Sequence, residues 1–143
     1  MALRNGSRLG VSMHDVFPHG CHLVPDSITE AIDYDEATGR RTPAVDKHTG
    51  KPVFQCRVSD RDRGLEGRSR EVVVKILADR MPSAPTGTAF ELVEFDGLQV
   101  TPYVDNGRCQ GKGRCGARMA FSLRATGIKA ARPAAVQPGK DAA

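Results

Sequence analysis

Cysteine and histidine are the residues of this 143-residue chain with the most specific chemistry, as metal ligands or nucleophiles. Five residues separate Cys109 from Cys115, a wider gap than the two to four residues usual between paired zinc ligands. Cys21 and Cys56 would have to complete such a site. No metal spacing or nucleophile motif surrounds any of the histidines, which are His14, His19, His22 and His48. We therefore expect isolated, reduced thiols, no metal, no cofactor and no enzymatic activity.

A glycine-rich segment at residues 111–116 matches the pattern G-x-G-x-x-G, which binds dinucleotides in some folds. That function requires a helix after the glycines and an acidic residue roughly 20 positions later. Here a strand pattern follows, and the chain ends in an Ala/Pro-rich stretch. We interpret the segment as a β-hairpin loop whose basic residues could clamp a phosphate backbone, namely Arg108, Lys112 and Arg114.

Charge is distributed unevenly along the chain. Residues 1–96 carry 13 Lys/Arg and 15 Asp/Glu, a net charge of −2, whereas residues 97–143 carry 8 Lys/Arg and 2 Asp/Glu, a net charge of +6. A strongly basic half favours binding of a polyanion. Nothing resembles a phosphate-binding P-loop, a catalytic carboxylate pair or a helix-turn-helix, and the scarcity of helical patterns argues against reading of the major groove.

The elements that must position these residues are predicted to be short strands. Gly and Pro together make up 24 of 143 residues, which indicates many turns. No apolar run approaches the roughly 18 residues needed to cross a bilayer, and no signal-peptide pattern follows Met1, so we expect a cytoplasmic protein without a membrane partner. The length predicts a single domain at residues 1–129, followed by a disordered tail at residues 130–143.

Turn signals divide the first part of this domain. The segments 35–40 and 46–51 each combine Asp, Thr and Gly in the pattern of a hairpin turn, which predicts a three-strand meander with strands at 30–35, 40–46 and 51–59. Further strands are predicted at 71–78, 98–104 and 117–125. A short helix is expected within 9–17, where Ser12 and Asp15 form a potential capping box.

Together these signals predict a mainly β fold, a small antiparallel barrel of five to six strands that is OB-like, with the usual helix replaced by a loop at 82–87. Alternation places Phe54 and Phe121 on the apolar face, as core residues. The opposite face, where Gln55 also lies, carries the residues expected to bind nucleic acid: Arg57, Lys75, Gln99, Tyr103, Arg118 and Arg124. Cations would follow the phosphates and the tyrosine would stack on a base, although an ordinary solvated face would have a similar composition.

Several stretches resemble one family. They are Arg8-Leu-Gly-Val-Ser-Met13, Val16-Phe-Pro-His-Gly-Cys21, Val53-Phe-Gln-Cys-Arg-Val58, Val72-Val-Val-Lys-Ile76, Leu98-Gln-Val-Thr-Pro-Tyr-Val104 and Phe121-Ser-Leu-Arg-Ala-Thr-Gly127. Over residues 3–129 the chain resembles the plasmid replication, integration and excision activator proteins of actinomycete mobile elements. The resemblance implies a role in turning on replication and excision of an integrative conjugative element. It implies no catalytic residues, and the loop 106–116 departs from the family's shorter hairpin.

The resulting functional hypothesis is a non-enzymatic accessory protein that binds single-stranded DNA during replication or excision of a plasmid or integrative element. Replication or transfer proteins of the same element, or further copies of this chain, would be its protein partners. Two alternatives remain open at this point. One is a regulator that binds duplex DNA or a transcription partner, and the other is a protein-interaction module without affinity for nucleic acid.

Overall fold

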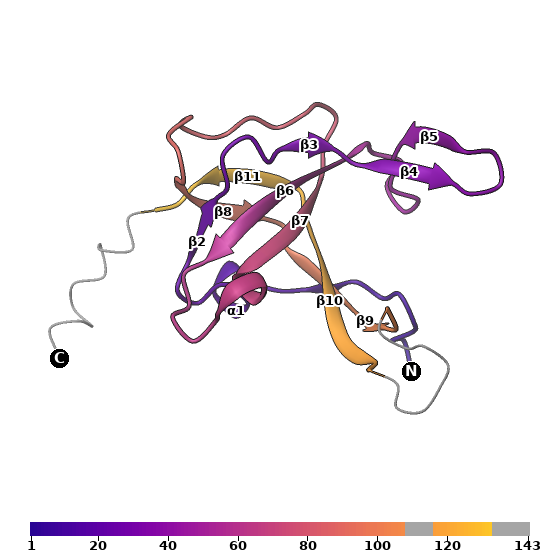
Figure 1. The fold of residues 1–143 in the computed structure, drawn as a ribbon, viewed down its shortest axis with the longest axis horizontal. Coiled ribbons are helices and arrows are strands. Elements are labelled where there is room, and N and C mark those ends of the chain that lie inside the picture. The colour runs from indigo at the N-terminus through magenta and orange to yellow at the C-terminus, as the bar shows by residue number, and fades with distance from the viewer. Residues whose placement is uncertain (108–115, 133–143) are drawn as a thin grey trace, which may run out of the picture.

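Short strands dominate the computed structural model, which describes residues 1–107 and 116–132 (Figure 1). The predicted tail from residue 133 onward and the loop residues 108–115 lie outside the described residues. So do the predicted phosphate-binding residues Arg108, Lys112 and Arg114.

In chain order the elements are β1 (Leu9–Gly10), α1 (Met13–Val16), β2 (Cys21–Leu23), β3 (Thr29–Glu30), β4 (Ile32–Asp35), β5 (Arg40–Pro43), β6 (Val53–Asp60), the 3₁₀ helix η1 (Gly67–Arg70), β7 (Glu71–Leu77), β8 (Leu92–Asp96), β9 (Gln99–Asp105), β10 (Arg118–Ala125) and β11 (Gly127–Ala130).

Strands β8 to β11 form one long hairpin that bends in the middle. The antiparallel register is continuous across the bend, from Gly127 opposite Asp96 to Arg124 opposite Gln99. Gly97 lies at the bend with φ 62°, a backbone conformation that favours glycine because it has no Cβ. The amide of Thr126 closes the bend by donating to the carbonyl of Asp96 at 2.8 Å.

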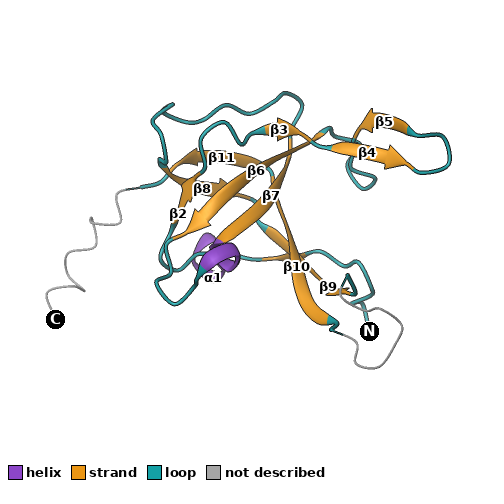
Figure 2. Ribbon diagram, viewed as in Figure 1, coloured by secondary structure: helices purple, strands orange, loops and turns teal. Residues whose placement is uncertain are grey.

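The bent hairpin allows the sheet to curl. β10 pairs with β7, β7 with β6, β6 with β2, and β2 with β8, so the pairings lead back to the hairpin from which they started. Figure 2 shows the resulting half-barrel, with α1 near one end. The predicted mainly β, barrel-like fold is confirmed. The expectation of a purely antiparallel sheet is wrong, because β7 and β10 run parallel.

The core lies on the concave side of this sheet. Its central residues alternate along β6 and β7, as the sequence pattern predicts for a sheet with one buried face. The buried cluster also includes both described cysteines, and Cys21 and Cys56 are free thiols. Burial raises the pKa of each thiol to about 12, so these cysteines are packing residues and poor nucleophiles at neutral pH.

The predicted meander is only partly correct. Both turns form as expected, because the amides of Gly39 and Gly50 donate to the carbonyls of Asp35 and Asp46 at 2.8 and 2.7 Å. However, β4 and β5 pair only with each other and form a separate two-stranded sheet. An isolated bridge between Val45 and Pro52 is the only bridge recorded between the end of this hairpin and the start of β6 among the described residues. The β4–β5 hairpin therefore projects from the barrel (Figure 1).

Other local predictions met with mixed outcomes. The capping box of α1 is present, with reciprocal hydrogen bonds between Ser12 and Asp15 at 2.8 and 3.0 Å. The segment between β7 and β8, which includes the predicted 82–87 loop, contains no helix. Strands β1, β2, β8 and β11 were not predicted, and β1 lies where the start of the helix was expected. Among the residues described, no helix has the length and apolar character needed to span a membrane.

Candidate functional site

A row of polar side chains crosses the convex face of the sheet, opposite the core. Gln55 of β6 is in register with Lys75 of β7, Lys75 with Arg124 of β10, and Arg124 with Gln99 of β9. Residues in register on neighbouring strands project on the same face and lie side by side. The structure therefore brings together three predicted site residues, Lys75, Arg124 and Gln99, with Gln55 beside them. We call these four residues the polar row.

Arg124 has the most unusual environment in the polar row. Its side chain is half-buried, and it donates one long hydrogen bond of 3.4 Å to the hydroxyl of Thr101. Burial lowers the pKa of its guanidinium and the neighbouring charge of Arg8 lowers it further, whereas the charge of Asp46 acts in the opposite direction. No ion pair joins Arg124 to an acid among the residues that the structure describes. The guanidinium thus has unused donors in a partly desolvated environment, where an oxyanion would stabilise its charge.

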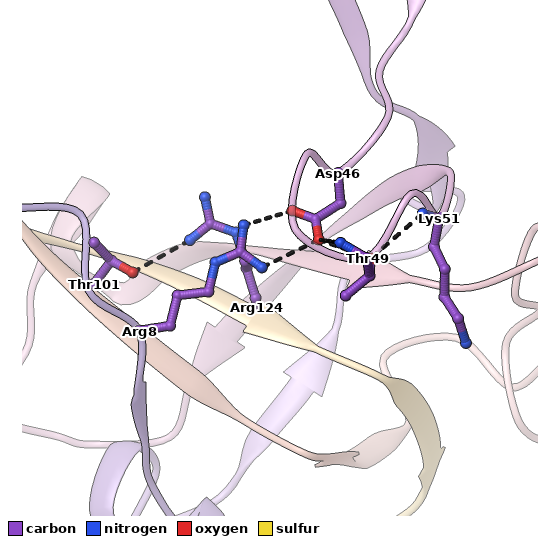
Figure 3. A network of polar contacts seen from close by, with 6 residues as sticks. All are labelled: Arg8, Asp46, Thr49, Lys51, Thr101 and Arg124. Carbon is purple, nitrogen blue, oxygen red and sulfur yellow. Dashed lines mark hydrogen bonds and ion pairs between the residues drawn. The ribbon is translucent and has the colours of Figure 1, made fainter.

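Arg8 itself is already paired. Its guanidinium donates two hydrogen bonds to the carboxylate of Asp46, and the side chains are only 13% and 4% exposed. Asp46 also accepts hydrogen bonds from the amide and hydroxyl of Thr49 at 3.0 and 2.7 Å. The Arg8 hydrogen bond, aided by those from Thr49, holds the pKa of Asp46 well below its usual range. Figure 3 shows this closed cluster beside the open guanidinium of Arg124.

Two hollows meet at the polar row. A groove of about 500 Å³ lies between the row and the base of the β4–β5 hairpin. Its charged lining residues are the cations Arg8, Lys47, Lys75 and Arg124 and the acids Glu30, Asp33 and Asp46, and His48 and Gln55 line it as well. A second hollow of about 460 Å³ lies on the other side of the row, where Tyr103 and Thr101 line it. Lys75 and Arg124 line both hollows and therefore lie between them.

The remaining predicted residues contribute less to this path. Arg57 is exposed but forms an ion pair with Glu71 at 2.7 Å, which neutralises its charge. Arg118 lies in register with Asp105 at the far end of β10. Tyr103 is 48% exposed on the same face as the row, and can present its ring to a ligand.

Phe121 corrects an expectation. The alternation in β10 assigned it to the core, but its side chain is 63% exposed. Figure 1 shows one end of the β9–β10 hairpin extending beyond the other strands, and Phe121 lines a hollow there that no described residue fills. Phe54, which has the same assignment, is buried as expected.

Sequence reasoning missed Arg8, Lys47 and His48. Arg8 reaches Asp46 across 38 positions of sequence, and no local pattern indicates so distant a contact. Lys47 and His48 belong to a turn whose Asp-Thr-Gly signal predicts its shape but not the groove beside it. Only the charge of Arg8, at the start of a short strand, could have drawn attention to it.

Metal chemistry finds no support in the part of the chain that is described, since it contains no cluster of three or more His, Cys, Asp or Glu side chains placed to hold an ion. The free cysteines in this part are buried separately from the polar row. Comparisons with family models, with curated proteins and with solved structures give no match to this chain.

Proposed function

We propose that the convex face of the sheet binds single-stranded DNA, with the polar row at the centre of the interface. The observation that carries this proposal is the half-buried guanidinium of Arg124, which has one long hydrogen bond and forms no direct ion pair with an acid among the described residues. A phosphate oxygen would supply the negative charge and the acceptors that this group lacks. Lys75, next to it in register, would meet an adjacent phosphate.

The two hollows explain why a single strand fits better than a compact anion. A nucleic-acid strand needs a path along which cations follow the backbone and aromatic rings accept unpaired bases. Lys75 and Arg124 lie between the groove and the hollow lined by Tyr103, and so form the centre of such a path. The amides of Gln55 and Gln99 flank the cations and can meet base edges.

The interpretation of the curled sheet as an OB-like barrel supports the same proposal, because barrels of this type bind oligonucleotides across their second and third strands. Under this interpretation β6 and β7 would correspond to those strands, and both contribute to the polar row. We propose a non-enzymatic protein that acts in the cytoplasm on strands exposed during replication or excision. This role agrees with what the resemblance to the plasmid replication, integration and excision activators implies.

A salt titration of oligonucleotide binding tests the proposal. We expect a fluorescent oligothymidine to bind at low salt, and the variant Arg124→Gln to reduce the slope of log K against log salt by about 1, as loss of one phosphate contact would. Lys129→Gln is the matched control, because Lys129 on β11 is paired with Asp96 on β8 and lines neither hollow. Equal effects of the two variants, or no binding at low salt, would refute the interface.

Competition with duplex DNA tests the preference for single strands. Unlabelled single strands should displace the probe at much lower concentrations than a duplex of the same sequence. Tyr103→Ala should weaken binding by about 1–3 kcal/mol with little change in the salt slope, since stacking engages a base and not a phosphate. Equal displacement by duplex would instead identify a regulator that contacts duplex DNA.

A further inference from the structure

Strands β7 and β10 pair over only part of their lengths. Their parallel ladder joins Leu123–Ala125 to Val74–Ile76, whereas β7 begins at Glu71 and β10 at Arg118. Beyond the ladder the two strands diverge, as both ribbon views show (Figures 1 and 2). Each of these free segments is paired on its other side, β7 with β6 and β10 with β9. The divergence therefore leaves two strand edges between β7 and β10 with which no described strand pairs.

The free edge of β7 can be assigned to particular residues, because successive residues of a strand direct their backbone groups to opposite edges. The carbonyl of Arg57 in β6 accepts a hydrogen bond from Val24 at 3.0 Å, on the edge away from β7. Its register partner Val73 must likewise direct its groups away from β6, toward β10. Glu71, two residues earlier, has the same orientation and lies beyond the ladder with β10.

The same reasoning identifies the free groups of β10. The carbonyl of Leu98 accepts a hydrogen bond from Val11 at 3.0 Å, on the edge away from β10. Pro102 lies four residues after Leu98, so its backbone groups also point away from β10. Its register partner Phe121 therefore directs its backbone amide and carbonyl away from β9, toward the gap between β10 and β7. Met119 does the same. These two residues give β10 an edge of unpaired donors and acceptors within the described structure, and such an edge is a template for another strand.

The two sides of this edge differ in chemistry. On the concave side is an apolar hollow of about 450 Å³, lined by Val11, Val16, Phe17, Val72, Phe121 and Leu123 among others. Phe121 and the neighbouring Met119 are 63% and 61% exposed, so a large apolar surface is left uncovered at the edge. On the convex side is the hollow that Lys75 and Arg124 line with their cations, and the ring of Phe121 borders this hollow as well as the apolar one.

We propose that the β10 edge binds an extended segment of a partner protein in which apolar and acidic residues alternate. A strand added to this edge projects successive side chains to opposite faces of the sheet. Every second side chain would therefore enter the apolar hollow beside Phe121. The side chains between them would meet Lys75 and Arg124, and acidic residues are the complement of these charges.

Charge and backbone chemistry both argue for an acidic partner over a second copy of this chain. If β10 paired with β10 of another copy, Arg118 and Arg124 would bring like charges together on the convex face, and like-charge pairs are destabilising. The outer edge of β9 offers no alternative beyond β1, because Pro102 has no amide to donate there. The β10 edge is therefore the available one, and it favours negative charge.

The first test uses synthetic peptides with the wild-type protein. A labelled peptide of alternating valine and glutamate should bind, as measured by fluorescence anisotropy, and a peptide of alternating valine and lysine should not. N-methylation of every second residue removes the donors on one edge of the peptide. Two such peptides are compared, one methylated at the odd-numbered positions and one at the even-numbered positions. We expect one of them to lose binding and the other to retain it, because only one edge of the peptide pairs with β10. Binding of both methylated peptides would overturn the proposal.

A matched pair of variants provides the second test. Phe121→Ser should weaken peptide binding about tenfold or more, as loss of an apolar anchor does at an interface. Phe90→Ser removes another exposed phenylalanine, which lines neither this hollow nor the polar row, and should leave binding unchanged. Equal losses in both variants would refute the site. Self-association that Phe121→Ser abolishes, without any peptide binding, would assign the edge to a second copy and overturn the proposal.

Discussion

The two ends of the β9–β10 hairpin have similar sequence patterns and opposite environments. At the base, Leu123 is buried in the core, and on the other face Arg124 lies beside the closed Arg8–Asp46 cluster. At the projecting end, Met119 and Phe121 continue the same apolar alternation but are exposed, and Tyr103 is open on the convex face. The core covers the apolar face of the base, whereas the described residues leave Met119, Phe121 and Tyr103 exposed at the projecting end.

This difference shows what alternation can and cannot determine. Period-two patterning decides which face of a strand is apolar, because side chains alternate across the backbone. Whether that face is buried depends on whether another element lies opposite it. The base has such elements, and the end that carries Phe121 does not among the described residues. An exposed apolar strip of this kind is typical of an interaction surface.

Truncation of apolar residues should separate the two ends most strongly. Leu123→Ala removes a buried side chain and should lower the free energy of unfolding by about 3 kcal/mol, whereas exposed Met119→Ala should change it by less than about 0.5 kcal/mol. Urea denaturation followed by circular dichroism measures both. Similar losses in the two variants would mean that the projecting end is covered in solution and would break the comparison.

Acid should weaken the ion pair between Arg8 and Asp46, which lies beside Arg124 at the base of the hairpin. The pKa of Asp46 is lowered in the folded state, so its ionisation stabilises the fold above the unfolded value near 3.9 and this contribution disappears as the pH falls through the folded pKa. We expect Asp46→Asn to cost about 2 kcal/mol at pH 7. The variant should also lose less stability than wild type between pH 5 and pH 2, by denaturation at each pH. Parallel pH profiles would contradict the assignment.

The bend that joins the two sides of the hairpin should tolerate no side chain. A Cβ at Gly97 would lie 2.6 Å from the hydroxyl oxygen of Thr126, and φ is positive. Gly97→Ala should therefore destabilise by about 1–3 kcal/mol. Gly39→Ala is the control, because it has a similar φ of 69° but open space around it. Thermal melts should show a larger loss at residue 97, and Thr126→Ala in the same chain should recover part of the difference.

An exposed ion pair should have the smallest effect. Arg57 and Glu71 lie where β7 extends past its ladder with β10, and their side chains are 52% and 44% exposed. Arg57→Gln should therefore lower the free energy of unfolding by no more than about 0.5 kcal/mol. A loss close to that of Asp46→Asn, measured in the same denaturant series, would show that this region is more enclosed than the structure indicates.

The fold was predictable where sequence signals were local. The Asp-Thr-Gly turns formed because a carboxylate, a hydroxyl and a positive-φ glycine satisfy the turn backbone by themselves. β2 escaped detection because three residues carry too little alternation, and β8 because its charged residues obscure the apolar ones. The parallel pairing of β7 with β10 depends on residues about 50 positions apart, for which one sequence contains no signal.

The candidate site was predictable as a face but not as a geometry. Strand parity placed Lys75, Gln99 and Arg124 on the same side of the sheet, and the register then made them neighbours. Sequence did not show that Glu71 would neutralise Arg57, or that Arg8 would approach Arg124. These are contacts between side chains that are distant in sequence, and they depend on how the sheet curls.

The continuous register of the bent hairpin has a consequence for how the chain reaches its fold. The register pairs run without a break from Arg118–Asp105 to Ala130–Val93, so they can form one after another, and each new pair closes only a short additional loop. A single local event thus prepares strands for both sides of the half-barrel, which lowers the sequence separation that later steps must bridge. The slow step of folding should be the pairing of β10 with β7, which is parallel and joins strands that are distant in sequence. A protein assembled in this order would have its recognition surfaces, which straddle that pairing, completed last.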